Sequence, residues 1–158
     1  MLTLKDKLVE TVLNSAGSKD FQHFYLKKDN RWIDVARDGQ VACAIFVSRK
    51  LAEFRGLIKN PHATVESTLK DMRASGWYKI DTPQPGAVIL WEKKIQTDGQ
   101  PHHHLGFYID TDKAISHSDQ TRTPIIHSLN FGSNDKDRSA RKIETFYWHL
   151  HLDESISL

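Results

Sequence analysis

Cys43 is the only cysteine of the chain, and histidines later in the sequence could make it a nucleophile. It lies near the start of the apolar run GQVACAIFVSRKLAEF, which is typical of a helix whose first half is buried. A helix N-terminus offers unpaired N–H groups and a positive dipole end, and both favour a thiolate. Unpaired cysteines are also among the most commonly buried residues, so this position alone assigns no role.

A thiol hydrolase also needs an imidazole base and a third polar group that orients the imidazole ring. If His104 opens a strand, His104 and Gly106 share one face, and the glycine leaves room for a helix end to approach. The next strand, 114–118, is expected to pair antiparallel and to bring His117 back toward His104. His117 is therefore the predicted orienting residue, with Ser116 or Ser118 as weaker substitutes.

The elements expected to position these residues are three helices followed by consecutive strands. The first helix is capped by Thr3 and ends at Gly17, the second spans 40–54 and carries Cys43, and the third begins at Asn60-Pro61. Beyond Gly76 the hydrophobic period changes to two. Six short strands are predicted, over 77–80, 87–92, 103–109, 113–116, 125–130 and 143–152. Helices followed by strands indicate an α+β fold with an antiparallel sheet.

Composition limits the class of protein. The 158 residues suit a single domain over 1–158, and 22 basic against 20 acidic residues give a net charge of +2 without a long basic block. Neither nucleic acid nor a membrane is an expected partner, and no cofactor is expected. A single thiol cannot form an internal disulfide. Without a signal-peptide pattern, we expect a cytoplasmic protein as encoded, with release by lysis or a dedicated secretion route left open.

Three segments taken in order resemble the NlpC-type and CHAP-type cysteine peptidases and amidases. They are the helix with Cys43, the segment PQPGAVILWE, and the segment HLGFYID followed by AISHS. The stretch 85–88 is similar to the families' Pro-Gly-Asp signature, and 104–108 is similar to their His-Val-Gly-Ile-Tyr motif. The sequence departs from the NlpC pattern in having Ala42-Cys43-Ala44 at the nucleophile and Ala87 in place of aspartate.

The resemblance implies a papain-like core in which the cysteine helix packs on the C-terminal sheet. It also implies that Cys43 is the nucleophile, His104 the general base and His117 the orienting residue. The substrate would be a cell-wall peptide or the amide that joins peptide to glycan in peptidoglycan. The expected reaction is hydrolysis of an amide or peptide bond through an acyl-enzyme, and a small acyltransferase with the same pair of residues stays an alternative.

The remaining site residues are expected around this thiol. One oxyanion donor would be the backbone N–H of Cys43, and the second an upstream side chain, for which Gln40 is favoured over Trp32 and Tyr25 because it lies one turn from the thiol. Trp32, in a polar stretch before the cysteine helix, could line a substrate groove, and His103 could contact substrate. Packing and solvation explain these two residues equally well.

Two other classes of function fit the same sequence. The first is a module on the same scaffold that binds peptide or glycan without turning it over, which predicts a Cys43 of ordinary acidity. The second is a zinc-binding protein, because His149 and His151 lie at i and i+2 of a predicted strand and could be joined by His127.

Overall fold

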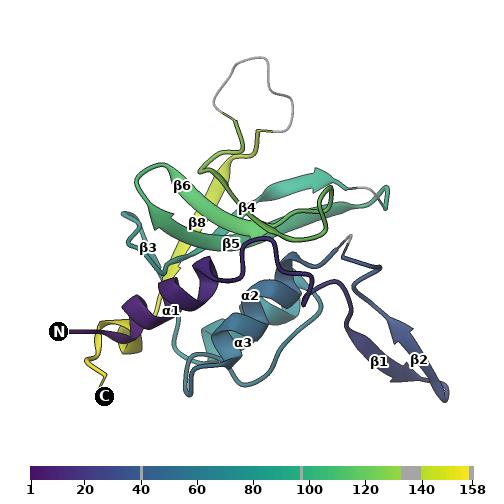
Figure 1. Ribbon diagram of the computed structural model, residues 1–158, viewed down its shortest axis with the longest axis horizontal. Helices are drawn as coiled ribbons and strands as arrows, with labels where there is room; N and C mark the ends of the chain where they lie inside the picture. The colour runs from purple at the N-terminus through teal and green to yellow at the C-terminus, as the bar shows by residue number, and fades with distance from the viewer. Residues whose placement is uncertain (40, 97, 133–139, 157–158) are drawn as a thin grey trace.

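The computed structural model describes residues 1–39, 41–96, 98–132 and 140–156, and its main sheet has six antiparallel strands (Figure 1). Their order across the sheet is β3-β8-β4-β5-β6-β7. The strands are β3 (Tyr78–Ile80), β4 (Val88–Ile95), β5 (Pro101–Asp110), β6 (Lys113–His117), β7 (Pro124–Ser128) and β8 (Ile143–Trp148). The expected α+β class and antiparallel sheet are confirmed. The last predicted strand ends earlier than 152, because a 3₁₀ helix, η1 (Leu150–Asp153), follows it.

The α-helices of the described residues lie on one side of this sheet (Figure 1). They are α1 (Leu4–Leu13), α2 (Cys43–Ala52) and α3 (Val65–Ala74). Thr3 caps α1 through a capping box with Asp6, as the sequence predicts.

The predicted start of the third helix at Asn60-Pro61 is wrong. Its cap is Thr64, whose side chain accepts a hydrogen bond from the Ser67 N–H at 3.1 Å. The backbone N–H of Asn60 instead donates to the Asp71 carboxylate, at 3.2 Å. Because this amide is bound from within the helix, residues 60–63 form a loop that leads into α3.

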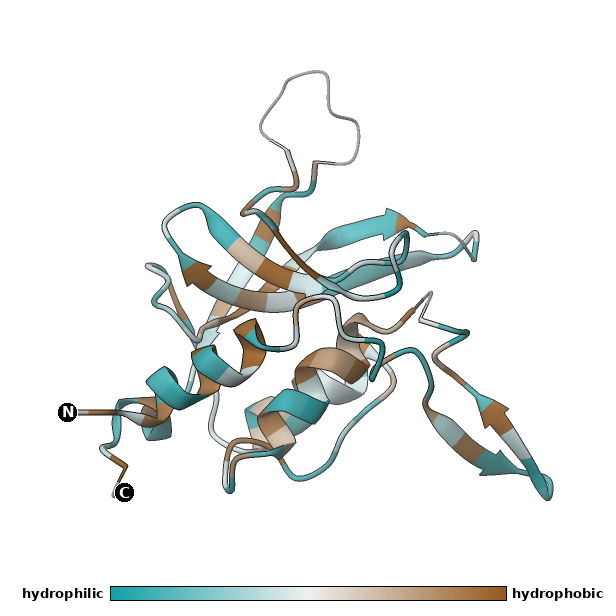
Figure 2. Cartoon of the chain, in the orientation of Figure 1, coloured by the Kyte–Doolittle hydropathy of each residue, from teal (hydrophilic) through white to brown (hydrophobic). Residues whose placement is uncertain are grey.

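A separate hairpin precedes α2 in the sequence. Strands β1 (Tyr25–Lys28) and β2 (Arg31–Asp34) pair with each other and with none of the other described strands, and they project from the body of the molecule (Figure 1). Figure 2 shows hydrophilic residues at the hairpin tip and hydrophobic residues higher on each strand.

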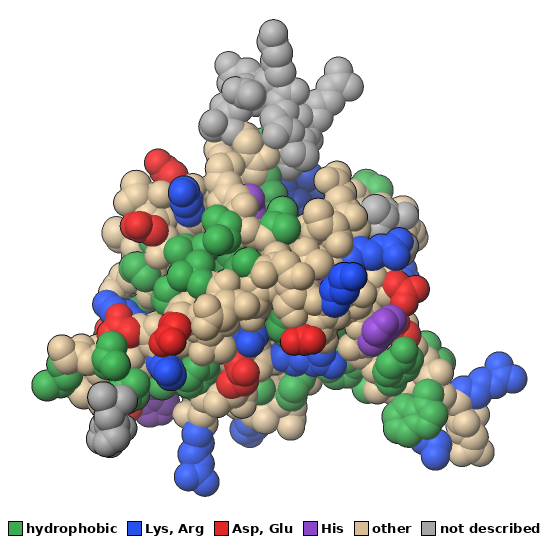
Figure 3. All heavy atoms as spheres, in the orientation of Figure 1, with side chains coloured by type: hydrophobic (Ala, Val, Ile, Leu, Met, Phe, Trp, Pro, Cys, Tyr) green, Lys and Arg blue, Asp and Glu red, His purple; other side chains and the backbone are tan. Residues whose placement is uncertain are grey.

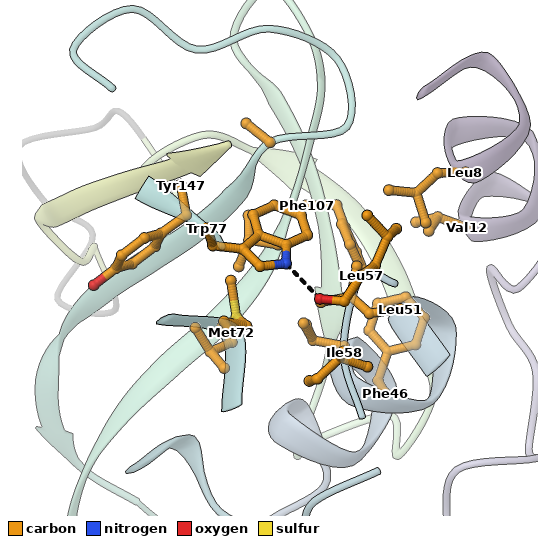
Figure 4. Packing of buried hydrophobic residues seen from close by; sticks show 14 of the residues in the cluster. Leu8, Val12, Phe46, Leu51, Leu57, Ile58, Met72, Trp77, Phe107 and Tyr147 are labelled. Carbon is orange, nitrogen blue, oxygen red and sulfur yellow. Dashed lines mark hydrogen bonds between the residues drawn. The ribbon is translucent and has the colours of Figure 1, made fainter. Parts of the chain in front are cut away.

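The main core fills the space between the helices and the sheet. The Phe46 ring of α2 meets the Phe107 ring of β5 edge to face, with centroids 5.7 Å apart. Trp77 donates to the Leu57 carbonyl at 2.7 Å within the same cluster (Figure 4). This packing seats α2 against β5, so that its first residue lies beside the start of that strand.

A second, smaller core lies on the opposite face of the sheet, around Ile89, Trp91 and Ala114. Both faces of the central strands are therefore covered. Alternating residues of β4, β5 and β6 consequently enter different cores. None of the described helices has both the length and the apolar character needed to cross a membrane.

Candidate functional site

A pocket of about 490 Å³ opens where the N-terminus of α2 meets the ends of β4, β5 and β6. Its wall includes Cys43 of α2, His103 and His104 of β5, and His117 of β6. The β1–β2 hairpin contributes Leu26. The structure therefore brings four of the predicted site residues to one cavity, although they come from segments far apart in the sequence.

Cys43 is the first residue of α2, and its thiol is half-buried. Burial raises the pKa of this thiol, and a hydrogen bond from the Leu105 N–H and the charge of Arg141 offset the rise only in part. The N–H groups of Ala44 and of Cys43 itself also lower that pKa. The expectation that the helix end favours a thiolate is therefore not met, because desolvation outweighs the backbone N–H groups. The thiol is protonated at neutral pH.

His104 is held at its Nε2 atom and is neutral. Nε2 lies 2.9 Å from the Ser116 hydroxyl, and the ring lies 5.4 Å from that of Trp91, its neighbour across β4. Burial lowers the pKa of His104 well below its usual range, and the positive charge of Arg141 acts in the same direction. The ring is thus an uncharged base whose Nε2 is already engaged.

The prediction that His117 orients His104 is wrong. Successive residues of a strand point to opposite faces, and Ser116 is the residue of β6 that reaches His104. His117 points to the helix side, where its ring meets Phe21 edge to face at 6.2 Å. Among the described residues, neither of its ring nitrogens has a hydrogen-bond partner, and burial lowers the pKa of His117 to about 4. His117 is a neutral histidine in the pocket wall.

Gly106 leaves room for a different neighbour from the one expected. A Cβ at this position would lie 2.9 Å from the Trp91 ring and 2.7 Å from the Ile115 carbonyl oxygen. Both Gly106 and His104 face the Trp91 side of the sheet, so the glycine admits Trp91 and not the end of α2. What brings α2 close to the start of β5 is the packing of Phe46 on Phe107.

Two further residues near the site were not predicted from the sequence to act with Cys43. His127 accepts from or donates to the Ser116 hydroxyl at 2.7 Å, and it entered the sequence analysis only as a zinc candidate. Arg141 is 8% exposed, and its Nη1 has no hydrogen-bond partner among the described residues. It lies in a polar segment without a motif, so no sequence signal identifies it.

The remaining site predictions have mixed outcomes. His103 lines the pocket as expected, and its Nε2 lies 3.2 Å from the Glu144 carboxylate. Trp32 is 68% exposed on β2 and is absent from the pocket wall. It faces away because it pairs with Lys27, one position out of phase with Leu26, which does line the pocket. Gln40 lies outside the described residues.

The predicted zinc set is not assembled. The two nitrogens of His127 face Ser116 and the Ser128 carbonyl, while His149 Nε2 faces the Ser75 carbonyl at 2.7 Å. Within the described ranges, the one group of three possible metal ligands is His23, Asp34 and Asp38, at the base of the hairpin. That group is partly exposed, and its members already bond to one another.

Comparison with protein-family models finds no match for this chain, and a search of curated proteins finds none either. What the site can do is therefore argued from its own geometry.

Proposed function

We propose that the protein is a thiol hydrolase that cleaves an amide or peptide bond through an acyl-enzyme formed on Cys43. The observation that carries this proposal is the shared pocket, in which a thiol at a helix N-terminus and a neutral imidazole line one cavity. In the proposed site Ser116 replaces His117 as the group that holds the His104 ring.

Cys43 and His104 are both uncharged before substrate reacts, so the thiol is deprotonated during the reaction and not before it. Cys43 loses its proton to His104 while the sulfur attacks the substrate carbonyl, and the resulting imidazolium protonates the leaving amine. A thioester remains on the sulfur. Neutral His104 then takes a proton from water, the hydroxide oxygen bonds to the thioester carbon, and the C–S bond breaks to release the acid and restore the thiol.

Backbone N–H groups near the sulfur support the same chemistry. The N–H groups of Cys43, Ala44 and Leu105 approach the thiol closely enough to lower its pKa. Donors placed in this way stabilise negative charge on the sulfur or on a neighbouring oxyanion. The buried Arg141 guanidinium adds a positive charge on the same side.

The resemblance to NlpC-type and CHAP-type enzymes suggests the substrate class and a papain-like arrangement of the core. The substrate would be the peptide part of peptidoglycan or the amide that joins it to the glycan. Acyl transfer to an amine is the variant reaction on the same pocket. We expect the protein to act without a cofactor.

The test is the release of amine from purified peptidoglycan fragments. With the wild-type protein, the summed mass of the products is expected to exceed the mass of the fragment by one water for each bond cleaved. Cys43→Ala is expected to lower the rate of amine release by about 10³-fold or more. His104→Gln should cause a comparable loss, whereas the matched variant His151→Gln, at a histidine that pairs with Glu154 outside the pocket wall, should retain activity. Full activity of Cys43→Ala would rule out this mechanism.

A binding module that does not turn over its ligand is the second candidate, and the protonated thiol favours it. It predicts that the wild-type protein binds the same fragments, measured by calorimetry, without releasing amine. Binding that is equal in wild type and Cys43→Ala, together with no amine release, would select this candidate over the hydrolase.

A further inference from the structure

A hydrogen-bond chain crosses three adjacent strands behind His104. It runs from His104 on β5 to Ser116 on β6 at 2.9 Å, and from Ser116 to His127 on β7 at 2.7 Å. It ends where His127 Nδ1 lies 2.7 Å from the Ser128 carbonyl oxygen. All three side chains lie on the face of the sheet that carries Trp91.

The last bond of this chain fixes the direction of the others. A carbonyl oxygen can only accept, so His127 Nδ1 must carry a proton and donate to Ser128. His127 is half-buried, and burial lowers the pKa of its ring, which is therefore neutral with a bare Nε2. Ser116 must then donate its hydroxyl proton to His127 Nε2. The Ser116 oxygen is left as an acceptor, so His104 donates from Nε2.

Aromatic rings separate this chain from water. Phe131 stacks on His127 with ring centroids 3.9 Å apart and an angle of 18° between the rings. The Trp91 ring lies 5.4 Å from His104 and 5.6 Å from His127, and Ser116 is 1% exposed. The buried Ser116 hydroxyl is therefore shielded from water, and a reversed orientation of the chain would leave the bare Nδ1 of His127 facing the Ser128 carbonyl oxygen, two acceptors with no proton between them.

We propose that His127 is a positioning residue that acts through Ser116 to hold His104 in the tautomer protonated on Nε2. In this tautomer Nδ1 is the nitrogen with a free lone pair, and it is the atom that accepts the proton of Cys43. The consequence for catalysis rests on the proposed function, whereas the tautomer itself does not. Neither Ser116 nor His127 belongs to the pocket wall, so their effect on the reaction is indirect.

The tautomers can be measured directly in the native protein. In long-range ¹H–¹⁵N spectra of ¹⁵N-histidine-labelled protein at neutral pH, His104 is expected to show a protonated Nε2 and a bare Nδ1. His127 is expected to show the reverse pattern. A His104 ring protonated on Nδ1 overturns the inference, whether or not the protein hydrolyses anything. If the spectra show the inferred tautomers but the protein binds fragments without turnover, the tautomer inference stands and the hydrolase proposal fails.

Variants test whether His127 sets the tautomer of His104. Ser116→Ala and His127→Phe are expected to give His104 a mixture of both tautomers and to lower kcat by about 10- to 100-fold with little change in KM. His127→Gln keeps an acceptor for the Ser116 hydroxyl, so it should restore both the single His104 tautomer and the wild-type kcat. The matched control is His149→Phe, a buried histidine bonded to Ser75 instead, which should alter neither. A pure His104 tautomer in folded His127→Phe would contradict the role assigned to His127.

Discussion

At the scale of single residues, the site consists of groups whose charges are suppressed by burial. Cys43 would be ionised more readily in water, and His104 and His117 would be more readily protonated. Each shift has desolvation as its largest cause. The site therefore rests as a neutral thiol beside neutral imidazoles, and its reactivity depends on proton transfer during the reaction.

The pH dependence of Cys43 alkylation follows from this. With iodoacetamide, the rate is expected to rise with pH with a midpoint above the value of about 8.5 for a free cysteine, because burial raises the pKa of the thiol. Arg141→Met should move the midpoint higher still, since the guanidinium lowers the pKa of Cys43.

Lys93→Met serves as the control for that experiment, because Lys93 lines the pocket without being among the groups that shift the thiol. Its midpoint should equal that of the wild type. A wild-type midpoint well below that of free cysteine would show a resting thiolate and contradict the neutral site.

Acid stability is the second prediction at this scale. Burial lowers the pKa of His117 to about 4, so between pH 6.5 and 4 the unfolded chain binds a proton that the folded protein excludes. Stability contributed by neutral His117 is complete above pH 6.5 and is lost as the pH falls toward 4, at a cost of about 3 kcal/mol.

Urea titrations of wild type and His117→Leu across this range measure the effect. The variant loses no hydrogen bond with a described residue, so we expect it to fold and to lose less stability on acidification. His151→Gln, on an exposed histidine, is the control and should follow the wild type. Parallel pH curves for wild type and His117→Leu would show that His117 does not contribute.

At the scale of elements, the strand β5 decides which residues can reach one another. His104 and Gly106 face the smaller core with Trp91, whereas Leu105 and Phe107 face the helices. The sequence pattern identified this alternation correctly. It did not reveal that helices cover one face and Trp91 the other, so it assigned Gly106 the wrong neighbour and His117 the wrong partner.

Gly106→Ala is the prediction for this element. Its added methyl group would meet the Ile115 carbonyl at 2.7 Å and the Trp91 ring at 2.9 Å, and the backbone oxygen cannot move without disturbing β6. We expect the free energy of unfolding to fall by about 2–3 kcal/mol.

Chemical denaturation of Gly106→Ala and Gly17→Ala measures this cost. At Gly17 a Cβ would meet no atom within 4 Å, and the cost there is limited to the positive φ of 78°, about 1 kcal/mol. An equal or smaller loss for Gly106→Ala would show that β5 and Trp91 are not packed as described.

At the scale of the whole molecule, the hairpin β1–β2 differs from the rest of the fold. Figure 3 shows hydrophobic and basic side chains side by side on this projection, at the lower right. Trp32 and Tyr25 are more than half exposed there, and the two strands pair with no other strand of the described residues. At its base the Asp34 carboxylate accepts from the Phe24 N–H at 2.9 Å and the Ala36 N–H at 3.0 Å.

Hydrogen exchange should separate the hairpin from the sheet. An isolated two-stranded hairpin is marginally stable, so its amides should exchange through local opening, faster than those of β4 and β5. Asp34→Ala should accelerate exchange in the hairpin alone, and Arg31→Ala, at an exposed position at the start of β2, should have little effect. Protection of the hairpin equal to that of β5 would contradict this division.

The sequence alone determined the features that depend on local pattern: the α+β class, the antiparallel strands, the Thr3 cap, and a cysteine at the start of a helix. These depend on hydrophobic period and on nearby capping residues, which are read over a few positions. Only the tertiary structure decided that Ser116, with His127 behind it, holds His104, and that burial keeps Cys43 protonated. Hydrogen-bond partners and desolvation depend on which strands and helices pack against one another, and no local pattern encodes that packing.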